Sequence, residues 1–197
     1  MSVPQQLRDD PRWTRLVDLV RELAFLDGGN DEAFTLASGR TSRWFFDMKP
    51  VMMHPEAGRL VGQLMNVRCD EIGADFVGGL ELGAVPLAAL VVATDFTSER
   101  LGFMVRKQAK GRGGRKTNNP PGIEGASISE GGRVIILEDV TTTGGSAIQA
   151  VKRIEEETSC EVVAVISILD RQEGGKEAFE DAGIAFESLL VRSDISG

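Results

Sequence analysis

Short apolar runs that alternate with helical patterns constrain the fold of this chain more than any other feature. The runs cover residues 76–80, 101–105, 133–137, 162–169 and 184–190. Helices are predicted after Asp10-Pro11, after Pro55, and over residues 86–93, 146–157 and 173–182. Strands that are apolar on both faces and alternate with helices are typical of a parallel sheet covered on both sides. We therefore expect an α/β fold.

The length of 197 residues suits one domain with a full core, and we predict a single domain over residues 1–197. No repeat or linker divides the sequence. Residues 34–48 are predicted to form two short extended pieces bent at Ser38-Gly39. Residues 106–122 are rich in Gly, Pro, Asn and basic side chains and have no apolar periodicity. A segment of this kind inside a compact domain is usually a functional or mobile loop.

The charge is strongly segregated along the chain. The total is 22 Lys and Arg against 30 Asp and Glu, a formal charge of −8. Between Arg100 and Ile123 there are seven basic residues and no acidic one. The negative total argues against a nucleic-acid or membrane-surface binder, because both partners are polyanionic. The cations of the basic island (residues 100–116) repel one another unless an anion or acidic neighbours gather them. We interpret the whole island as a clamp for one small polyanion.

Other features favour a cytoplasmic location. No apolar run approaches the length that spans a bilayer, and residues 1–12 lack the apolar core of a secretory signal. Cys69 and Cys160 lie far apart in the sequence, which predicts two unreactive thiols in a reducing compartment. His54 precedes Pro55 and the start of a predicted helix, so we expect a surface or capping role for it.

The stretch Val134 to Ser146, VIILEDVTTTGGS, carries the clearest chemistry. It predicts a buried strand, an adjacent acid pair, a hydroxyl- and glycine-rich turn, and a helix start. Backbone N–H groups and hydroxyls at such a turn hold a phosphate dianion. The acid pair repels phosphate but suits a ribose diol or a divalent cation. The combination indicates a sugar-phosphate site at the carboxyl end of a strand.

The same stretch also has a simpler, purely structural interpretation. A strand that ends in a solvated acidic turn with a Ser/Thr helix cap uses the same residue types. Two acids, three threonines and two glycines directly after an apolar strand favour the sugar-phosphate site over that reading. Neither common nucleotide motif competes, since no strand is followed by G-x-G-x-x-G and Arg115 interrupts the P-loop pattern before Lys116.

This stretch resembles the phosphoribosyl-diphosphate (PRPP) motif of type I phosphoribosyltransferases, and further segments narrow the resemblance to orotate phosphoribosyltransferases. Four segments are similar to that family's N-terminal signature, second loop, catalytic loop and Asp-Arg strand end, in this order: FTLASGRTSRWFFD (34–47), GGLELGAVP (78–86), VRKQAK (105–110) and LDRQEG (169–174). They span residues 34 to 174. The resemblance implies a parallel-sheet type I phosphoribosyltransferase fold with a small hood from about residues 1–50 and a mobile catalytic loop at about 106–122.

The family reaction is transfer of the 5-phosphoribosyl group from PRPP to orotate, with Mg²⁺, giving orotidine 5′-monophosphate and pyrophosphate in pyrimidine synthesis. Displacement of pyrophosphate builds positive charge on the ribose and negative charge on the leaving group, so catalysis is mainly electrostatic. The resemblance also implies a homodimer in which the catalytic loop closes over the neighbouring subunit's site. Mg²⁺ is expected to bind through PRPP and water, with few direct protein ligands.

The resemblance and the chemistry together give the expected site residues. The catalytic set is Lys110, Arg106, Lys107 and Asp139. PRPP is expected to contact Arg106, Lys107, Lys110, Arg112, Glu138, Asp139, Thr141, Thr142, Thr143, Gly144, Gly145 and Ser146. Orotate is expected to contact Ser38, Gly39, Phe46, Thr142 and Arg171. Arg171 suits the orotate carboxylate by its fork geometry, and Phe46 suits the planar ring.

The sequence departs from the family pattern at several positions. Arg112 stands where members with a Lys-x-His-Gly loop carry histidine, and Ala37 and Gly83 stand where some members carry lysine. Residues 113–122 also make the loop longer than expected. Two alternatives therefore stay open at this stage: a purine-base type I phosphoribosyltransferase, and a non-catalytic regulator on the same fold that senses PRPP or nucleotides and binds nucleic acid.

Overall fold

The computed structural model describes residues 2–29, 34–35, 41–95, 100–108 and 117–197. The helices are α1 (Gln5–Arg8), α2 (Pro11–Leu23), α3 (Lys49–Met52), α4 (Pro55–Ile72), α5 (Ala84–Ala93), α6 (Gly145–Glu157), α7 (Gly175–Asp181) and α8 (Arg192–Ser196). The strands are β1 (Phe25–Asp27), β2 (Phe34–Thr35), β3 (Thr41–Ser42), β4 (Trp44–Phe46), β5 (Phe76–Leu80), β6 (Leu101–Val105), β7 (Ile123–Gly125), β8 (Gly132–Thr141), β9 (Cys160–Asp170) and β10 (Phe186–Val191).

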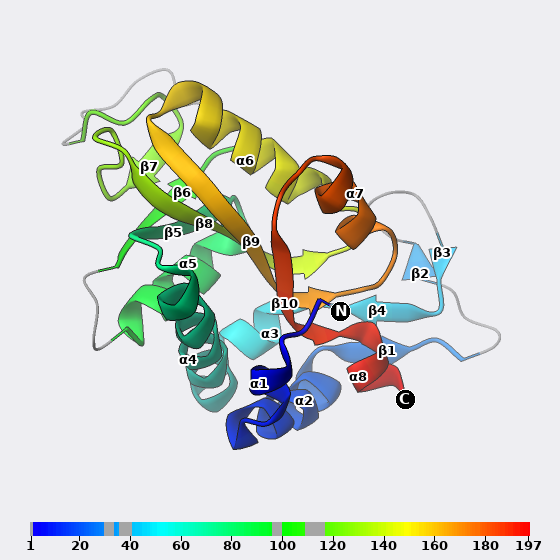
Figure 1. Cartoon of the computed structure of the whole chain (residues 1–197). Coiled ribbons are helices and arrows are strands. Elements are labelled where there is room, and N and C mark those ends of the chain that lie inside the picture. The colour runs from blue at the N-terminus through cyan, green and yellow to red at the C-terminus, as the bar shows by residue number, and fades with distance from the viewer. Residues whose placement is uncertain (1, 30–33, 36–40, 96–99, 109–116) are drawn as a thin grey trace.

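The main sheet has six strands in the order β10-β9-β8-β5-β6-β7. The pairs from β10 to β6 are all parallel, and β7 is antiparallel to β6 at one edge. Helices α4 and α5 cover one face of the sheet, and α6 and α7 cover the other (Figure 1). The predicted parallel sheet with helices on both sides is thus confirmed.

The strand order reverses between β5 and β8. From β5 the chain moves through α5 to β6 on one side, whereas β8, β9 and β10 follow on the other. In an open α/β sheet, ligands bind beyond the carboxyl ends of the strands at such a switch point. The loops after β5 and β8 therefore lie where a ligand is expected.

Residues near both ends of the chain contribute to the same core. The larger apolar cluster, between the sheet and α2, α4 and α5, runs from Leu7 to Ile195. A second cluster fills the opposite face under α6 and α7.

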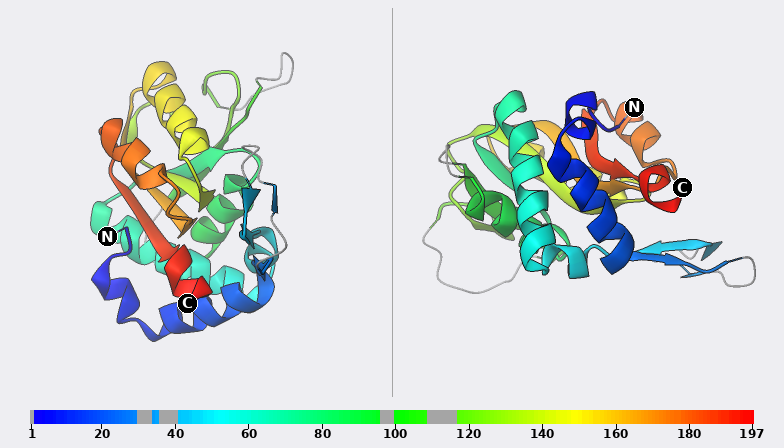
Figure 2. Two further views of the ribbon diagram at one scale, coloured as in Figure 1. Left: turned by 90° about the vertical axis from the view of Figure 1, so that its right-hand side faces the viewer. Right: turned by 90° about the horizontal axis from the view of Figure 1, so that it is seen from below.

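The short strands β1–β4 pair only with each other, β1 with β4 and β2 with β3, outside the main sheet (Figure 2). Whether residues 1–50 act as a hood stays a prediction.

Helix starts follow the signals in the sequence. The Asp10 carboxylate accepts a hydrogen bond from Arg12 N at 2.8 Å, and Pro11 takes the first position of α2. At α4, His54 Nδ1 accepts from the backbone N–H groups of Glu56 and Ala57, at 3.3 Å each. The capping role expected for His54 is confirmed.

Several strands differ from the sequence prediction, among them β1, which was not predicted. β8 runs on through Glu138 and Asp139 to Thr141, where a turn was expected, because the long strand β9 pairs with it as far as Asp170. β7 was not predicted at all. Its three residues are held by pairing with β6, which nothing local in the sequence signals.

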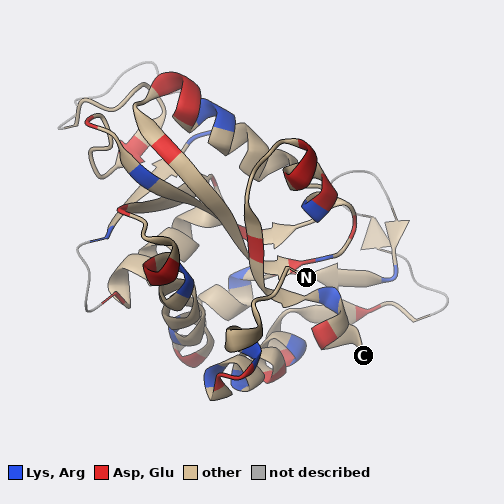
Figure 3. Cartoon of the chain, in the orientation of Figure 1, with Lys and Arg blue, Asp and Glu red and all other residues tan. Residues whose placement is uncertain are grey.

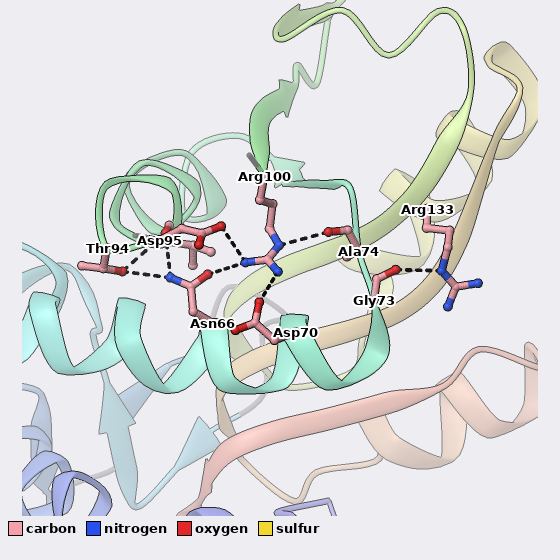
Figure 4. Close-up of polar contacts among 9 residues, drawn as sticks. Asn66, Asp70, Gly73, Ala74, Thr94, Asp95, Arg100 and Arg133 are labelled. Carbon is pink, nitrogen blue, oxygen red and sulfur yellow. Dashed lines mark hydrogen bonds and ion pairs between the residues drawn. The ribbon is translucent and has the colours of Figure 1, made fainter. Parts of the chain in front are cut away.

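Arg100 corrects the interpretation of the basic island as one anion clamp. Its side chain is 2% exposed at the amino end of β6, the edge opposite the expected ligand site. The guanidinium donates to Asn66 Oδ1 at 2.6 Å, Asp70 Oδ1 at 2.6 Å, Ala74 O at 3.1 Å and Asp95 Oδ2 at 3.0 Å (Figure 4). Arg100 thus fastens α4, α5 and β6 together, and its positive charge is already compensated inside the protein.

The placement of the cysteines agrees with the sequence expectation, and the charges outside the basic island are mixed (Figure 3). Acidic and basic residues are interspersed along α2, α4, α6 and α7 (Figure 3). Cys69 and Cys160 are buried free thiols, and burial raises the pKa of Cys69 to about 12. Among the described helices, none combines the length and the hydropathy that crossing a bilayer requires.

Candidate active site

A cavity of about 300 Å³ lies beyond the carboxyl ends of β8 and β9. It gathers eight of the predicted residues from β8, the following turn and the start of α6, together with Phe46 and Arg171. The lining residues are Phe45, Phe46, Asp47, Met48, Lys49, Glu138, Asp139, Val140, Thr141, Thr142, Thr143, Gly144, Gly145, Ser146 and Arg171. The size suits a small polar ligand, and the lining combines carboxylates, hydroxyls and one buried guanidinium.

The turn between β8 and α6 presents backbone N–H groups at a helix start. Gly144 adopts φ 76°, a conformation that favours glycine, and α6 begins at Gly145 directly after it. The first N–H groups of a helix have no partner within the helix. Together with the hydroxyls of Thr142, Thr143 and Ser146, these groups form a cradle suited to a phosphate dianion. Thr141 lies within β8, so the cradle starts one residue later than the sequence suggested.

Glu138 and Asp139 lie next to each other at the end of β8. Glu138 is 9% exposed, whereas Asp139 is half-buried and its Oδ1 accepts a hydrogen bond from Val140 N at 2.9 Å. Burial, and then the neighbouring Asp139 carboxylate, raise the pKa of Glu138 from its ordinary value of 4.5 to about 8. At neutral pH Glu138 is therefore largely protonated, and its carboxyl group can both donate to and accept from a ribose diol.

The raised pKa of Glu138 makes the stability of the ligand-free protein pH-dependent. Between about pH 4.5 and 8 the folded protein keeps a proton that the unfolded chain has released, so stability falls as the pH rises through this window. Glu138→Gln removes the titrating group. We expect the variant to be more stable than the wild type by on the order of 2 kcal/mol at pH 8, with a difference that shrinks toward pH 5.

Urea unfolding at several pH values measures this difference. The exposed Glu161, 71% accessible, supplies the matched control Glu161→Gln, whose pH dependence should run parallel to that of the wild type. A Glu138→Gln curve that also runs parallel to the wild type would show that Glu138 titrates normally.

The loop after β5 closes against the acid pair. A Cβ atom on Gly83 would lie 2.5 Å from the carboxyl carbon of Asp139, so only glycine allows the present approach. In the same loop, Glu81 Oε1 accepts a hydrogen bond from Lys107 N at 2.8 Å, and the Glu81–Leu82 peptide is cis. The second loop, at the end of segment 78–86, thus lies between the acid pair and the start of loop 106–122.

Arg171 follows β9 and lines the cavity from within the protein. It is 3% exposed, and its guanidinium pairs with Glu173 at 2.9 Å and donates to Ser42 Oγ and Trp44 O at 3.0 Å each. These bonds tie the strands β3 and β4 to the main sheet. The guanidinium carbon lies 5.8 Å from the ring of Phe46, a cation–π distance.

Phe46 borders the cavity but belongs largely to the core. Its side chain is 5% exposed and its ring packs on Phe25 with centroids 5.2 Å apart. Phe45, on the other face of β4, also lines the cavity and is less buried. Stacking of an aromatic base on Phe46 stays a prediction.

Arg106 and Lys107 lie at the end of β6 and do not line the cavity. The guanidinium of Arg106 pairs with Glu124 at 3.4 Å and Glu81 at 3.8 Å. These two carboxylates are the acidic neighbours that hold this part of the basic island. Lys107 is exposed, and its charge acts on Glu138 in the direction that lowers the pKa, opposing the larger effects of burial and Asp139.

Four predicted residues lie outside the described part of the chain: Ser38, Gly39, Lys110 and Arg112. Five lining residues were not among the predicted ones: Phe45, Asp47, Met48, Lys49 and Val140. Lys49 lines the cavity from α3, pairs with Asp47 at 2.9 Å, and its pKa is raised by Asp47 and, to a lesser extent, by the charge of Asp139. The only signal in the sequence was a lone lysine shortly after the Phe45-Phe46 pair, and such a lysine is common on protein surfaces.

Comparison with known proteins agrees with this geometry. Residues 52–186 match the family described as phosphoribosyl transferase domain. The orotate phosphoribosyltransferase of Rhodopseudomonas palustris (strain BisB5) is 42% identical over 185 residues, covering 91% of this chain and 94% of that protein. This chain belongs to the orotate phosphoribosyltransferase family.

Solved structures of the family superpose on nearly the whole chain. The Mycobacterium tuberculosis H37Rv orotate phosphoribosyltransferase in complex with Fe(III) dicitrate has a TM-score of 0.80 and 33% identity, covering 95% of this chain and all of that one. The same enzyme in complex with PRPP has a TM-score of 0.76 and 32% identity with the same coverage. Membership in this family favours neither the purine-base transferase nor the non-catalytic regulator.

Proposed function

We propose that this protein transfers the 5-phosphoribosyl group of PRPP to orotate, giving orotidine 5′-monophosphate and pyrophosphate in the de novo synthesis of UMP. The observation that carries the proposal is the acid pair Glu138-Asp139 followed by the phosphate cradle, in one cavity at the switch point of the sheet. The likeness to a family member bound to PRPP supports the same ligand here.

Within this function the cavity residues divide between the two ends of PRPP. Thr142, Thr143, Gly144, Gly145 and Ser146, with the start of α6, bind the 5′-phosphate through N–H and hydroxyl donors, and Thr141 supports the turn. The Thr141 hydroxyl is buried and has no hydrogen-bond partner among the described residues, a condition that recurs at ligand sites. Glu138 and Asp139 hold the two ribose hydroxyls.

The catalytic contribution is electrostatic. As the bond from ribose C1 to pyrophosphate lengthens, the ribose gains positive charge, which the carboxylate of Asp139 stabilises. The leaving pyrophosphate gains negative charge, which Arg106 and Lys107 stabilise together with Lys110 and Arg112 of the catalytic loop. These cations contribute most in the transition state, where the charge separation is larger than in the bound substrate.

The acid pair also fits Mg²⁺. Carboxylate oxygens are the ligands this cation prefers, and Mg²⁺ usually keeps several of its water molecules. Clusters of three or more possible metal ligands do not occur among the described residues, so PRPP oxygens and water are proposed as its main ligands. When bound, Mg²⁺ supplies positive charge to the diphosphate. Asp139 is the residue best placed to hold a metal-bound water.

Orotate is proposed to bind between Arg171 and the Phe45-Phe46 strand, with contacts from Ser38, Gly39 and Thr142. The guanidinium of Arg171 uses Nε and Nη2 for the protein contacts described above, and Nη1 donates to no described residue. That nitrogen is available for the orotate carboxylate. The walls formed by strands β1–β4 then serve as the hood.

Arg171→Lys tests this assignment. Lysine keeps the charge but lacks the planar fork, and a hydrogen bond to a charged group contributes about 1.5–3 kcal/mol. We expect the KM for orotate to rise about ten-fold or more while the KM for PRPP changes little. Steady-state kinetics with each substrate varied in turn measure both constants. Arg12→Lys is the control, because Arg12 pairs with Asp10 away from the cavity. Equal increases in both constants would contradict a specific orotate contact.

A homodimer and a cytoplasmic location complete the proposal. An apolar groove between α5, β6 and β7, lined by Val85, Ala88, Val92 and Phe103, supports association with a second copy on the side from which loop 106–122 leaves the sheet. In that arrangement the catalytic loop of one subunit completes the site of the other. Two buried free thiols suit a reducing compartment. Nucleic acid and membrane are not proposed as partners.

The test of the function is the loss of orotate absorbance when PRPP and Mg²⁺ are added to the purified protein. Rapid loss that depends on both additions is expected, with pyrophosphate released in equal amount. No loss of orotate, combined with consumption of a purine base or tight RNA binding, would overturn the proposal in favour of one of the two alternatives.

A further inference from the structure

Arg153 lies where α6 passes the base of loop 106–122. Helix α6 begins at the phosphate cradle, and Arg153 is eight residues further on, about 12 Å along the helix axis. Its side chain is 19% exposed. The residue lies outside the cavity, and none of the sequence motifs includes it.

The guanidinium of Arg153 bridges the two ends of the loop. Nη1 donates to Arg106 O at 2.7 Å, Nη2 donates to Pro121 O, and Nε donates to Glu157 at 3.0 Å. The two ends of the loop are also joined directly, by a hydrogen bond from Arg106 N to Gly122 O at 2.8 Å. Strands β6 and β7 separate at this point. Arg153 donates hydrogen bonds to the two backbone carbonyls that lie just beyond the last hydrogen bond between the strands.

Gly122 leaves room for this arrangement. Its φ is 90°, and a Cβ atom on it would lie 2.6 Å from Arg153 Nη2. Any side chain at position 122 would therefore displace the guanidinium as well as strain the backbone. The glycine and the arginine act as one unit at the base of the loop.

The same backbone carries the cations that face the pyrophosphate. Arg106 accepts the Arg153 hydrogen bond through its own carbonyl oxygen, and the next residue, Lys107, is fixed by its N–H to Glu81. A backbone shift at Arg106 therefore moves both side chains relative to Glu138 and Asp139. Misplacement of a catalytic group by about 1 Å can cost on the order of 100-fold in rate.

We propose that Arg153 is a positioning residue that couples the helix of the phosphate cradle to the base of the catalytic loop and so sets the place of Arg106 and Lys107. The inference rests on the proposed function. Arginine is required because one planar guanidinium offers two parallel donors to two carbonyls, whereas an ammonium is a single point charge.

The experiment compares Arg153→Lys with Arg133→Lys. Arg133 is a matched control, because its guanidinium also donates to two backbone carbonyls, Gly73 O at 2.7 Å and Ile72 O at 2.9 Å, and also pairs with a glutamate (Figure 4 shows the bond to Gly73). It lies at the amino edge of the sheet, away from the cavity. Melting temperature, pyrophosphate affinity by calorimetry, kcat and the KM for orotate are measured for each protein.

For Arg153→Lys we expect pyrophosphate affinity and kcat to fall about ten-fold, with the KM for orotate within about two-fold of the wild type. Arg133→Lys should lower the melting temperature to a similar extent without this split. Gly122→Ala should reproduce the split, and the double variant should be no worse than the weaker of the two single variants, because both changes disturb one unit.

A merely structural role would give a different pattern. If Arg153→Lys lowers only the melting temperature, or lowers pyrophosphate and orotate binding equally, the inference is overturned. Failure of the proposed function is recognised separately, as a wild type that binds pyrophosphate but does not consume orotate. In that event the comparison of pyrophosphate affinities still decides the role of Arg153.

Discussion

Asp139→Asn is expected to weaken PRPP binding about 100-fold and to leave the fold intact, since the lost charged hydrogen bonds contribute about 1.5–3 kcal/mol each. The carboxylate lines the cavity and lies against Gly83, where a Cβ atom would be 2.5 Å from the carboxyl carbon of Asp139. Asparagine has the same shape and can still accept the bond from Val140 N. Asparagine lacks the negative charge that strengthens hydrogen bonds from a ribose diol and that stabilises a cationic ribose.

Calorimetric titration with PRPP and Mg²⁺ measures the affinity, and thermal unfolding without ligand measures the stability. Asp75→Asn is the matched control, because Asp75 Oδ2 likewise accepts a backbone bond, from Arg133 N at 2.8 Å, but at the amino edge of the sheet. Its PRPP affinity should equal that of the wild type. A large drop in the melting temperature of Asp139→Asn, with unchanged affinity for the folded fraction, would assign Asp139 a structural role instead.

Arg100→Met is expected to lower the free energy of unfolding by about 3 kcal/mol or more, the usual cost of removing one partner from a buried ion pair. The guanidinium makes four hydrogen bonds to residues of α4, the turn after it, and the segment after α5. Methionine fills much of the volume but offers no donor, so Ala74 O and Asn66 Oδ1 lose theirs. Both lie in a dry environment where that loss is costly.

Urea unfolding measures this effect, and the exposed pair of Arg15 and Glu56 supplies the control. Arg15→Met should change stability little, because solvent screens that pair. Turnover per folded molecule of Arg100→Met should stay close to the wild-type value, since the five residues of β6 separate Arg100 from the carboxyl edge of the sheet. A stable but inactive Arg100→Met protein would return Arg100 to the anion-binding group.

Much of the fold could be predicted because its signals are local. Apolar runs bounded by turn residues gave β5 and β6 with the bounds that the structure has, and Asp10-Pro11 and His54-Pro55 marked the starts of α2 and α4. The acid pair and the phosphate turn were predictable for the same reason. One continuous stretch of chain carries the acid pair, the threonines and the glycines that predict a sugar-phosphate site, and parallel strands place such a stretch at the carboxyl edge.

The parts that the sequence left open depend on strand order. Strand β7 forms only because β6 offers an edge, and β8 continues through its polar end only because β9 pairs with it. Lys49 reaches the cavity from a helix nearly 90 residues before the acid pair. No local pattern carries such information, because it resides in contacts between distant segments.

The basic island shows this division most clearly. The sequence by itself determined that seven cations cluster beside a sugar-phosphate motif and that an anion or acidic neighbours must hold them. For the described cations, only the tertiary structure decided which acidic groups pair with each of them. Arg100 and Arg106 stand at opposite ends of the same strand. The first is compensated by the buried carboxylate of Asp95 and the half-exposed one of Asp70 at the amino edge, and the second faces Glu81 and Glu124 near the site. The sequence determines the charge of each residue. The edge of the sheet at which the residue lies determines which group that charge pairs with.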